Sequence, residues 1–172
     1  MTTPADRLTL EQMNSMAKSD FMAQLGGIFE HSPWVAAGVY GRRPFDSVQE
    51  LHAAMMETAR QAEPDQVLAL LRAHPDLATR LAVSPLSAAE QQGAGLDRLT
   101  PEEFAQLTGL NAAYTAKFRF PFIFAVRGKT KEDILSAISA RVDRPLMEEQ
   151  EQALLEIGAI TRFRLEDLLG AE

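Results

Sequence analysis

The segment 118-FRFPFIFAV-126 decides whether this chain is all-helical or mixed, because it is the one candidate for a β-strand. Pro121 lies in its middle and has no amide hydrogen to donate to a neighbouring strand, so a regular strand is disfavoured. We therefore expect an irregular buried segment, in which some backbone amide and carbonyl groups find partners outside a sheet. Such a segment is suited to form a wall against a planar polar ligand.

On both sides of this segment the chain has the apolar spacing and the capping residues of helices. Helices are expected over residues 10–19, 20–30, 48–62, 65–73, 101–117, 131–142 and 145–169, with short helices after Pro33 and Ser87. Capping boxes are expected where a hydroxyl precedes a carboxylate by three residues: Ser87 with Glu90, Thr100 with Glu103, and Thr130 with Asp133. The sequence predicts one all-α domain over residues 1–172, with about eight helices, several of them short.

Composition excludes several classes of protein. The 172 residues suit one domain with a real core, since 46% are hydrophobic. The net charge of −7 argues against a nucleic-acid or membrane-surface partner but allows a local basic pocket. The chain has no cysteine, its start has no apolar signal region, and its longest apolar run is too short to span a bilayer. A cytoplasmic location is the resulting expectation.

His74 stands directly before Pro75, after a helical pattern that must end there because proline disfavours a helical conformation in the preceding residue. It has two interpretations. A histidine at a helix C-terminus can interact with the helix dipole and the last carbonyls. Alternatively, its near-neutral pKa suits a general acid or base. A metal site is not expected, because no paired-histidine spacing is present.

Glu90 also has two interpretations. As the third residue after Ser87 it would complete a capping box and hold the Ser87 amide. The same helix start, with Gln91 beside it, would offer several donors to an anion. Further along, Arg162 and Arg164 are two residues apart and point about 200° apart on a helix, so one can turn inward while the other stays in water. An inward guanidinium suits a carboxylate or a developing oxyanion.

The order of these motifs is more specific than any one of them. The stretches HPDLA (74–78), LSAAEQQGAGL (86–96), KFRFPFIFAV (117–126) and ITRFRL (160–165) follow one another. In this order they resemble the 2-oxo-4-hydroxy-4-carboxy-5-ureidoimidazoline (OHCU) decarboxylases of urate breakdown, and LGGIFEHSPWVA (25–36) fits as well. The resemblance covers roughly residues 21–168. One departure is Arg119, where the family usually has glycine.

The resemblance implies an all-α homodimer that decarboxylates OHCU to (S)-allantoin in purine catabolism without a cofactor, as a carboxy-lyase acting on a small anionic substrate. It implies His74 as the proton-transfer group, Glu90 as its partner and Arg164 as the third catalytic residue. It also implies a substrate-binding wall, made of Pro75, Ser87, Gln91, Phe122, Ile123, Phe124, Ala125 and Val126. Two other functions stay open: a helical domain that binds a ureide or purine-like ligand without turnover, and a helical interaction module.

Overall fold

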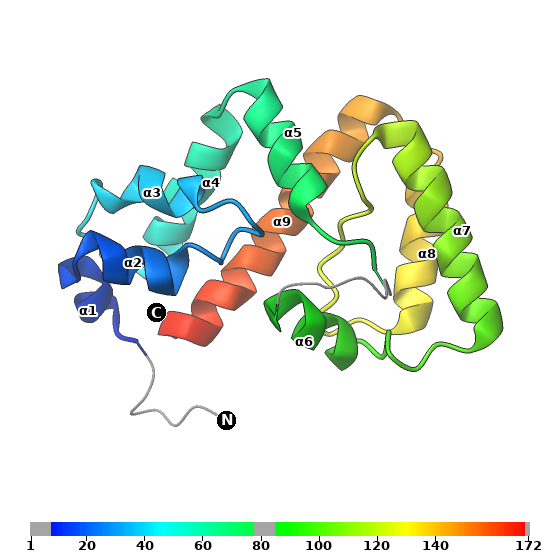
Figure 1. Ribbon diagram of the computed structural model, residues 1–172, viewed down its shortest axis with the longest axis horizontal. Helices are drawn as coiled ribbons and strands as arrows, with labels where there is room; N and C mark the ends of the chain where they lie inside the picture. Colours follow the sequence, from blue (N-terminus) through cyan, green and yellow to red (C-terminus); the bar gives the residue numbers. More distant parts are fainter. Residues whose placement is uncertain (1–7, 78–84, 171–172) are drawn as a thin grey trace. The chain divides into compact units, whose positions relative to one another are not determined.

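The computed structural model of the chain describes residues 8–77 and 85–170, and every regular element in these residues is an α-helix. The prediction of an all-α fold is confirmed, with nine helices in the described part where about eight were expected. They are shown in Figure 1. Their bounds are α1 Leu10–Ser15, α2 Lys18–Leu25, α3 Trp34–Tyr40, α4 Val48–Gln61, α5 Pro64–Ala73, α6 Pro85–Gly93, α7 Pro101–Phe118, α8 Lys131–Arg141 and α9 Leu146–Leu169.

The chain divides into two compact units. The first comprises residues 1–70 and 161–172, and the second comprises residues 71–160. In the first unit α3 packs against both α2 and α4. Thr9 caps α1 in a capping box with Gln12, and the Ser47 hydroxyl caps α4 by accepting from the Glu50 amide. Apolar side chains from these helices are buried, which gives the first unit a continuous hydrophobic core: Met13, Phe21, Leu25, Val35, Val39, Leu51 and Met55.

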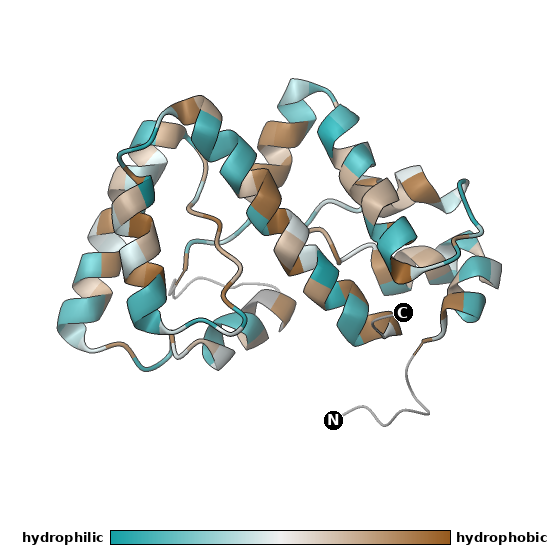
Figure 2. Cartoon of the chain, turned by 180° about the vertical axis from the view of Figure 1, so that it is seen from behind, coloured by the Kyte–Doolittle hydropathy of each residue, from teal (hydrophilic) through white to brown (hydrophobic). Residues whose placement is uncertain are grey.

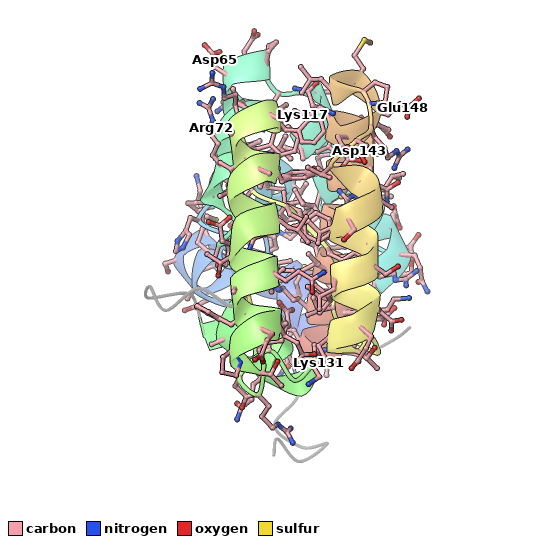
Figure 3. The ribbon with its side chains drawn as sticks, turned by 90° about the vertical axis from the view of Figure 1, so that its right-hand side faces the viewer. Asp65, Arg72, Lys117, Lys131, Asp143 and Glu148 are labelled. Carbon is pink, nitrogen blue, oxygen red and sulfur yellow. The ribbon has the colours of Figure 1, made fainter. Side chains whose placement is uncertain are left out.

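In the second unit α7 and α8 pack side by side and run in the same direction. At the end where both helices begin, Lys131 Nζ lies 2.8 Å from Glu103 Oε1. At the other end Lys117 Nζ donates to the Val142 carbonyl oxygen over 2.8 Å. Figure 3 shows Lys131 at one end of this pair of helices and Lys117 at the other. The predicted boxes at Thr100 and Thr130 are confirmed and fix where each helix begins.

Since α7 and α8 are parallel, residues 119–130 must return along their whole length, and Figure 1 shows this connection. The first part of the connection, residues 119–126, contains no helix or strand, as Pro121 predicted. Phe120 and Phe122 are buried and pack edge-on against the Tyr114 ring on α7, with ring centroids 5.9 and 5.4 Å away. Figure 2 shows hydrophobic colour along much of this connection. The irregular segment is therefore part of the core of its unit.

Two helix boundaries differ from the predictions. The helix expected over 10–19 is divided at Met16 and Ala17, which are both extended and separate α1 from α2. The helix expected over 20–30 ends at Leu25, directly before Gly26 and Gly27. Glycine is a poor helix former, so two in succession end the helix although apolar residues continue beyond them.

Candidate active site

His74 follows α5 directly and is buried, with 7% of its surface exposed. Pro64 is the first residue of the helix, where its missing amide hydrogen costs nothing. The helix ends at Ala73 as predicted, because Pro75 restricts His74. The His74 amide still donates to the Leu71 carbonyl oxygen over 3.4 Å. The local sequence thus places an imidazole at a helix end and mostly out of water.

Glu90 and Gln91 lie on α6, and both side chains are half-buried. The expected capping box of Ser87 with Glu90 is wrong, because α6 begins at Pro85 and makes Ser87 its third residue. The physical reason is the preference of proline for the first helical position. The side-chain position of Ser87 lies outside the described residues. As the third residue of α6, Ser87 does not occupy the N-cap position that the predicted capping box requires.

The segment from Phe122 to Val126 is held by side chains rather than by a sheet. Arg141 Nη1 donates to the Ile123 carbonyl oxygen over 2.8 Å, and the Arg141 guanidinium lies 4.5 Å from the centre of the Phe122 ring. The Ala125 amide donates to the Glu156 carboxylate. The prediction that irregular backbone here takes other partners is confirmed. Phe122, Ile123, Ala125 and Val126 are buried, whereas Phe124 is half-exposed.

A buried polar network fixes Arg141 in turn. Its Nε donates to Glu149 Oε1 over 2.8 Å, and the Tyr114 hydroxyl donates to the same oxygen over 2.6 Å. Glu149 has no exposed surface. Burial and the hydrogen bond to Glu149 raise the pKa of the Tyr114 hydroxyl. Burial also raises the pKa of Glu156, while the nearby Arg141 charge opposes that rise.

Sequence reasoning missed this network. Arg141 and Glu149 are eight residues apart on two different helices, and no local pattern predicts that they meet. One signal in the sequence was available. An irregular buried segment has carbonyl and amide groups that need hydrogen-bond partners. Charged residues on the helices that follow the segment can supply them.

Arg164 lies in the other unit and is also buried, with 4% of its surface exposed. Its Nη1 donates to the Ile28 carbonyl oxygen over 3.0 Å, and its Nη2 donates to Glu30 Oε2 over 3.1 Å. Arg162 is largely exposed and faces Glu166 on the same helix. The prediction that one arginine turns inward while the other stays in water is confirmed.

The predicted site residues therefore divide between the units. His74, Pro75, Glu90, Gln91 and the segment 122–126 belong to residues 71–160, whereas Arg164 belongs to the other unit. Chemically, the first group offers an imidazole, a carboxylate and a rigid stretch of backbone. Arg164 offers a cation that already forms an ion pair with the buried Glu30 carboxylate. That these groups share one site stays a prediction.

A pocket of about 740 Å³ lies within residues 71–160, between one face of α7 and the chain around the end of α5. None of the predicted site residues whose side chains the structure describes lines it, and we do not assign catalysis to it. Its lining residues are Arg72, Asp76, Leu77, Phe104, Thr108, Asn111, Ala112, Thr115, Ala116 and Arg119.

Arg119 explains why glycine suits this position in the resembling family. It follows α7 with φ +68° and ψ +19°, a left-handed conformation that glycine adopts without strain. Its amide donates to the Thr115 carbonyl, and its own carbonyl accepts from Arg72 Nε over 2.9 Å. The backbone bend is thus present although the residue is arginine.

In the part of the chain that the structure describes, no group of three or more histidine, aspartate or glutamate side chains could hold a metal ion. Over the same residues, no helix has the length and apolar character needed to cross a membrane.

Comparison with known proteins adds a family. The family model described as OHCU decarboxylase matches residues 14–166. The chain is 42% identical over 161 residues to the uric acid degradation bifunctional protein PucL of Bacillus subtilis, covering 94% of this chain but only 33% of that protein. It is 41% identical over 162 residues to the 2-oxo-4-hydroxy-4-carboxy-5-ureidoimidazoline decarboxylase of Halalkalicoccus jeotgali, covering 94% of this chain and 92% of that one.

Solved structures agree on the fold. A crystal structure of (S)-allantoin synthase superimposes with a TM-score of 0.78 at 31% identity, covering 94% of this chain and 54% of that chain. A crystal structure of OHCU decarboxylase in the presence of (S)-allantoin gives a TM-score of 0.70 at 23% identity, over 88% of this chain and 98% of that chain. At that lower identity the likeness concerns the fold alone.

Proposed function

Because the chain belongs to the OHCU decarboxylase family, we propose that it converts OHCU to (S)-allantoin and CO2, as a carboxy-lyase of urate degradation. The observation that carries this proposal is the family match over residues 14–166, which includes His74, Glu90 and Arg164. A relative that this chain covers almost end to end carries the decarboxylase name, at 41% identity.

The substrate supplies its own electron sink, which is why we propose a reaction without a cofactor. The bond between the ring carbon and the carboxylate breaks, and CO2 leaves. The electron pair moves into the adjacent ring C=N bond. The ring nitrogen of that bond receives the electrons and takes up a proton. The hydroxyl on the carbon that lost CO2 gives up its proton as it becomes a carbonyl, and the carbon bearing the ureido group gains a proton on one face. The protein is left with orientation, charge stabilisation and stereospecific proton transfer.

We assign the proton transfer to His74, because an imidazole can exist in either form near neutral pH. Its burial supports this role, since a mostly dry site strengthens the interaction of the ring with charge on a substrate. Glu90 orients the ring and favours its protonated form. Arg164 stabilises an oxygen whose charge grows in the transition state, because a grip on the departing carboxylate would stabilise the ground state instead.

The proposed binding wall comprises Pro75, Ser87, Gln91 and the backbone from Phe122 to Val126. Two contacts support the backbone part of this assignment: Ile123 to Arg141 and Ala125 to Glu156. A backbone that is fixed before the substrate arrives orients the substrate with less loss of conformational entropy on binding.

The proposal also covers the oligomeric state, the location and the domain organisation of the protein. We infer a homodimer, a cytoplasmic location and a single functional domain over residues 1–172, with no nucleic-acid or membrane partner. The dimer rests on the family, and the other parts rest on composition and charge. Sedimentation at several protein concentrations tests the dimer, because a monomer at all of them would contradict it.

The direct test incubates the purified protein with OHCU freshly generated from urate and follows optical rotation. An active enzyme gives (S)-allantoin faster than spontaneous decay, which gives both enantiomers. Heat-denatured protein and the His74→Asn variant serve as controls. Binding of (S)-allantoin without any acceleration would instead support a ligand-binding domain that lacks turnover, and would overturn the proposed reaction.

A further inference from the structure

Arg141 and Glu156 lie side by side and hold two consecutive peptide groups. Arg141 Nη1 is 3.9 Å from Glu156 Oε1. The same Nη1 donates to the Ile123 carbonyl, and the Glu156 carboxylate accepts from the Ala125 amide. The two peptide groups on either side of Phe124 are thus each held by one member of an ion pair.

This arrangement determines where the other halves of those peptide groups point. Both peptide bonds are trans, so the carbonyl and the amide of each group point in opposite directions. The Ile123 carbonyl and the Ala125 amide point toward the ion pair. The Phe124 amide and the Phe124 carbonyl therefore point away from it, on a common side. Among the described residues neither of these two Phe124 groups has a hydrogen-bond partner.

A donor and an acceptor from one residue form a specific recognition element. They match a group that carries an acceptor and a donor side by side, as a ureido group does with its C=O and NH2. We propose that Arg141 and Glu156 are positioning residues that aim the Phe124 amide and carbonyl at the ureido group of the substrate. This inference rests on the proposed function and adds the means by which that site selects a ureide.

The surrounding contacts restrict the ion pair to this geometry. Glu149 accepts hydrogen bonds from both Arg141 Nε and the Tyr114 hydroxyl, and the Arg141 guanidinium lies over the Phe122 ring. Arg144 Nη1 lies 3.4 Å from Glu149 Oε2. Among the described residues Arg144 makes no hydrogen bond or ion pair with residues 122–126. Arg144 therefore provides a matched control: it carries the same charge in the same network without the proposed role.

The experiment measures KM and kcat for OHCU in the whole protein. Glu156→Ala removes the acceptor for the Ala125 amide at a position on α9 where alanine favours the helix. The ureido group does not react, so its contacts act equally on the ground state and the transition state. We expect KM to rise about tenfold with kcat changed by less than about threefold. Glu156→Gln keeps an acceptor oxygen and should restore KM to within about twofold of the unaltered protein.

Two further measurements separate this role from a structural one. The Ala125 amide should exchange with solvent faster in Glu156→Ala than in Glu156→Gln, even if the alanine variant loses stability. Arg144→Ala should leave KM unchanged. Normal turnover together with an unchanged KM in Glu156→Ala would overturn the inference alone, as would an equal rise in KM for Arg144→Ala. No turnover in the unaltered protein would overturn the proposed function, and the inference with it.

Discussion

Arg164 and Glu30 are 134 residues apart in the chain, yet their side chains form an ion pair with 3.1 Å between Nη2 and Oε2. Both side chains are almost completely buried. Removing one member of such a pair leaves the other charge in a low-dielectric environment without compensation.

Arg164→Met should therefore destabilise the protein by about 3–5 kcal/mol. Arg162→Met is the matched control, because Arg162 is exposed and faces Glu166 over 3.9 Å, and it should cost less than about 1 kcal/mol. Urea unfolding followed by circular dichroism measures both free energies. Equal losses for the two variants would contradict the buried pair. Activity of Arg164→Lys, if that variant folds, tests the separate catalytic proposal.

Glu90→Gln should reduce kcat by ~10²-fold while the fold survives, because the substitution removes the negative charge proposed to orient and charge His74. His74→Asn should cause a similar loss. The double variant should lose far less than the product of the two single effects, since the pair acts as a unit. Single-turnover rates with OHCU measure the effects. Near-normal turnover in Glu90→Gln would contradict this pairing and would indicate that His74 has a purely structural role at the end of α5.

Exhaustive chelation should leave the rate of OHCU decarboxylation unchanged. The expected reaction uses the ring C=N bond as its electron sink, so it needs no metal ion to accept charge. The assay compares protein dialysed against EDTA with untreated protein, and then with protein supplied with single divalent metals. Loss of activity that one metal restores would contradict this prediction.

Arg119→Gly should leave stability unchanged or raise it by less than about 1 kcal/mol. Glycine relieves the left-handed strain of about 1–2 kcal/mol. It also increases the conformational entropy of the unfolded chain, which offsets part of this gain in stability. Arg119→Val should be destabilising, because a β-branched residue is strongly disfavoured at positive φ. Thermal unfolding of the three proteins checks this order. A valine variant as stable as the glycine variant would show that the bend after α7 is not left-handed.

Acid should weaken the contacts where α7 and α8 begin. Hydrogen bonds from Lys131 and from the Thr100 amide lower the pKa of Glu103, and the Thr130 backbone lowers the pKa of Asp133. A carboxyl whose pKa is lower in the folded state stabilises the fold above its unfolded pKa, which is about 4 for these groups. That stabilisation is lost as the pH falls through the lower folded value.

The measurement compares unfolding free energies between pH 5 and pH 3. The unaltered protein should lose more stability over this interval than the double variant Glu103→Gln, Asp133→Asn. An equal loss of stability in both proteins would show that the acid sensitivity comes from other carboxylates.

The sequence predicted the features that depend on neighbours in the chain. The caps at Thr100 and Thr130 follow from short-range hydrogen bonds, and the structure confirms both. Ser87 failed for an equally local reason, because Pro85 competes to begin the same helix and succeeds. Where two start signals are close together, the pattern alone does not choose between them.

The polar network could not be predicted in this way. Arg141 meets Ile123, Glu149 and Glu156 only because α8, α9 and the returning segment pack together. From the sequence, Arg141, Glu149 and Glu156 would each be expected on the surface, since charged residues are mostly exposed. For the two arginines, the sequence predicted only that either Arg162 or Arg164 could turn inward. It did not predict Glu30 as the partner of Arg164, because the two residues are 134 positions apart.

The parallel arrangement of α7 and α8 has an electrostatic consequence. Two helices that run the same way place their positive dipole ends together and their negative ends together, so the two macrodipoles repel instead of cancelling. Each first turn carries two acidic residues, and Lys117 and Arg141 occupy the last turns. Both ends of the pair are thus neutralised by side chains of opposite sign. Substituting Glu102 or Glu132 will therefore be felt by both helices, because each carboxylate offsets the summed field of two helix ends.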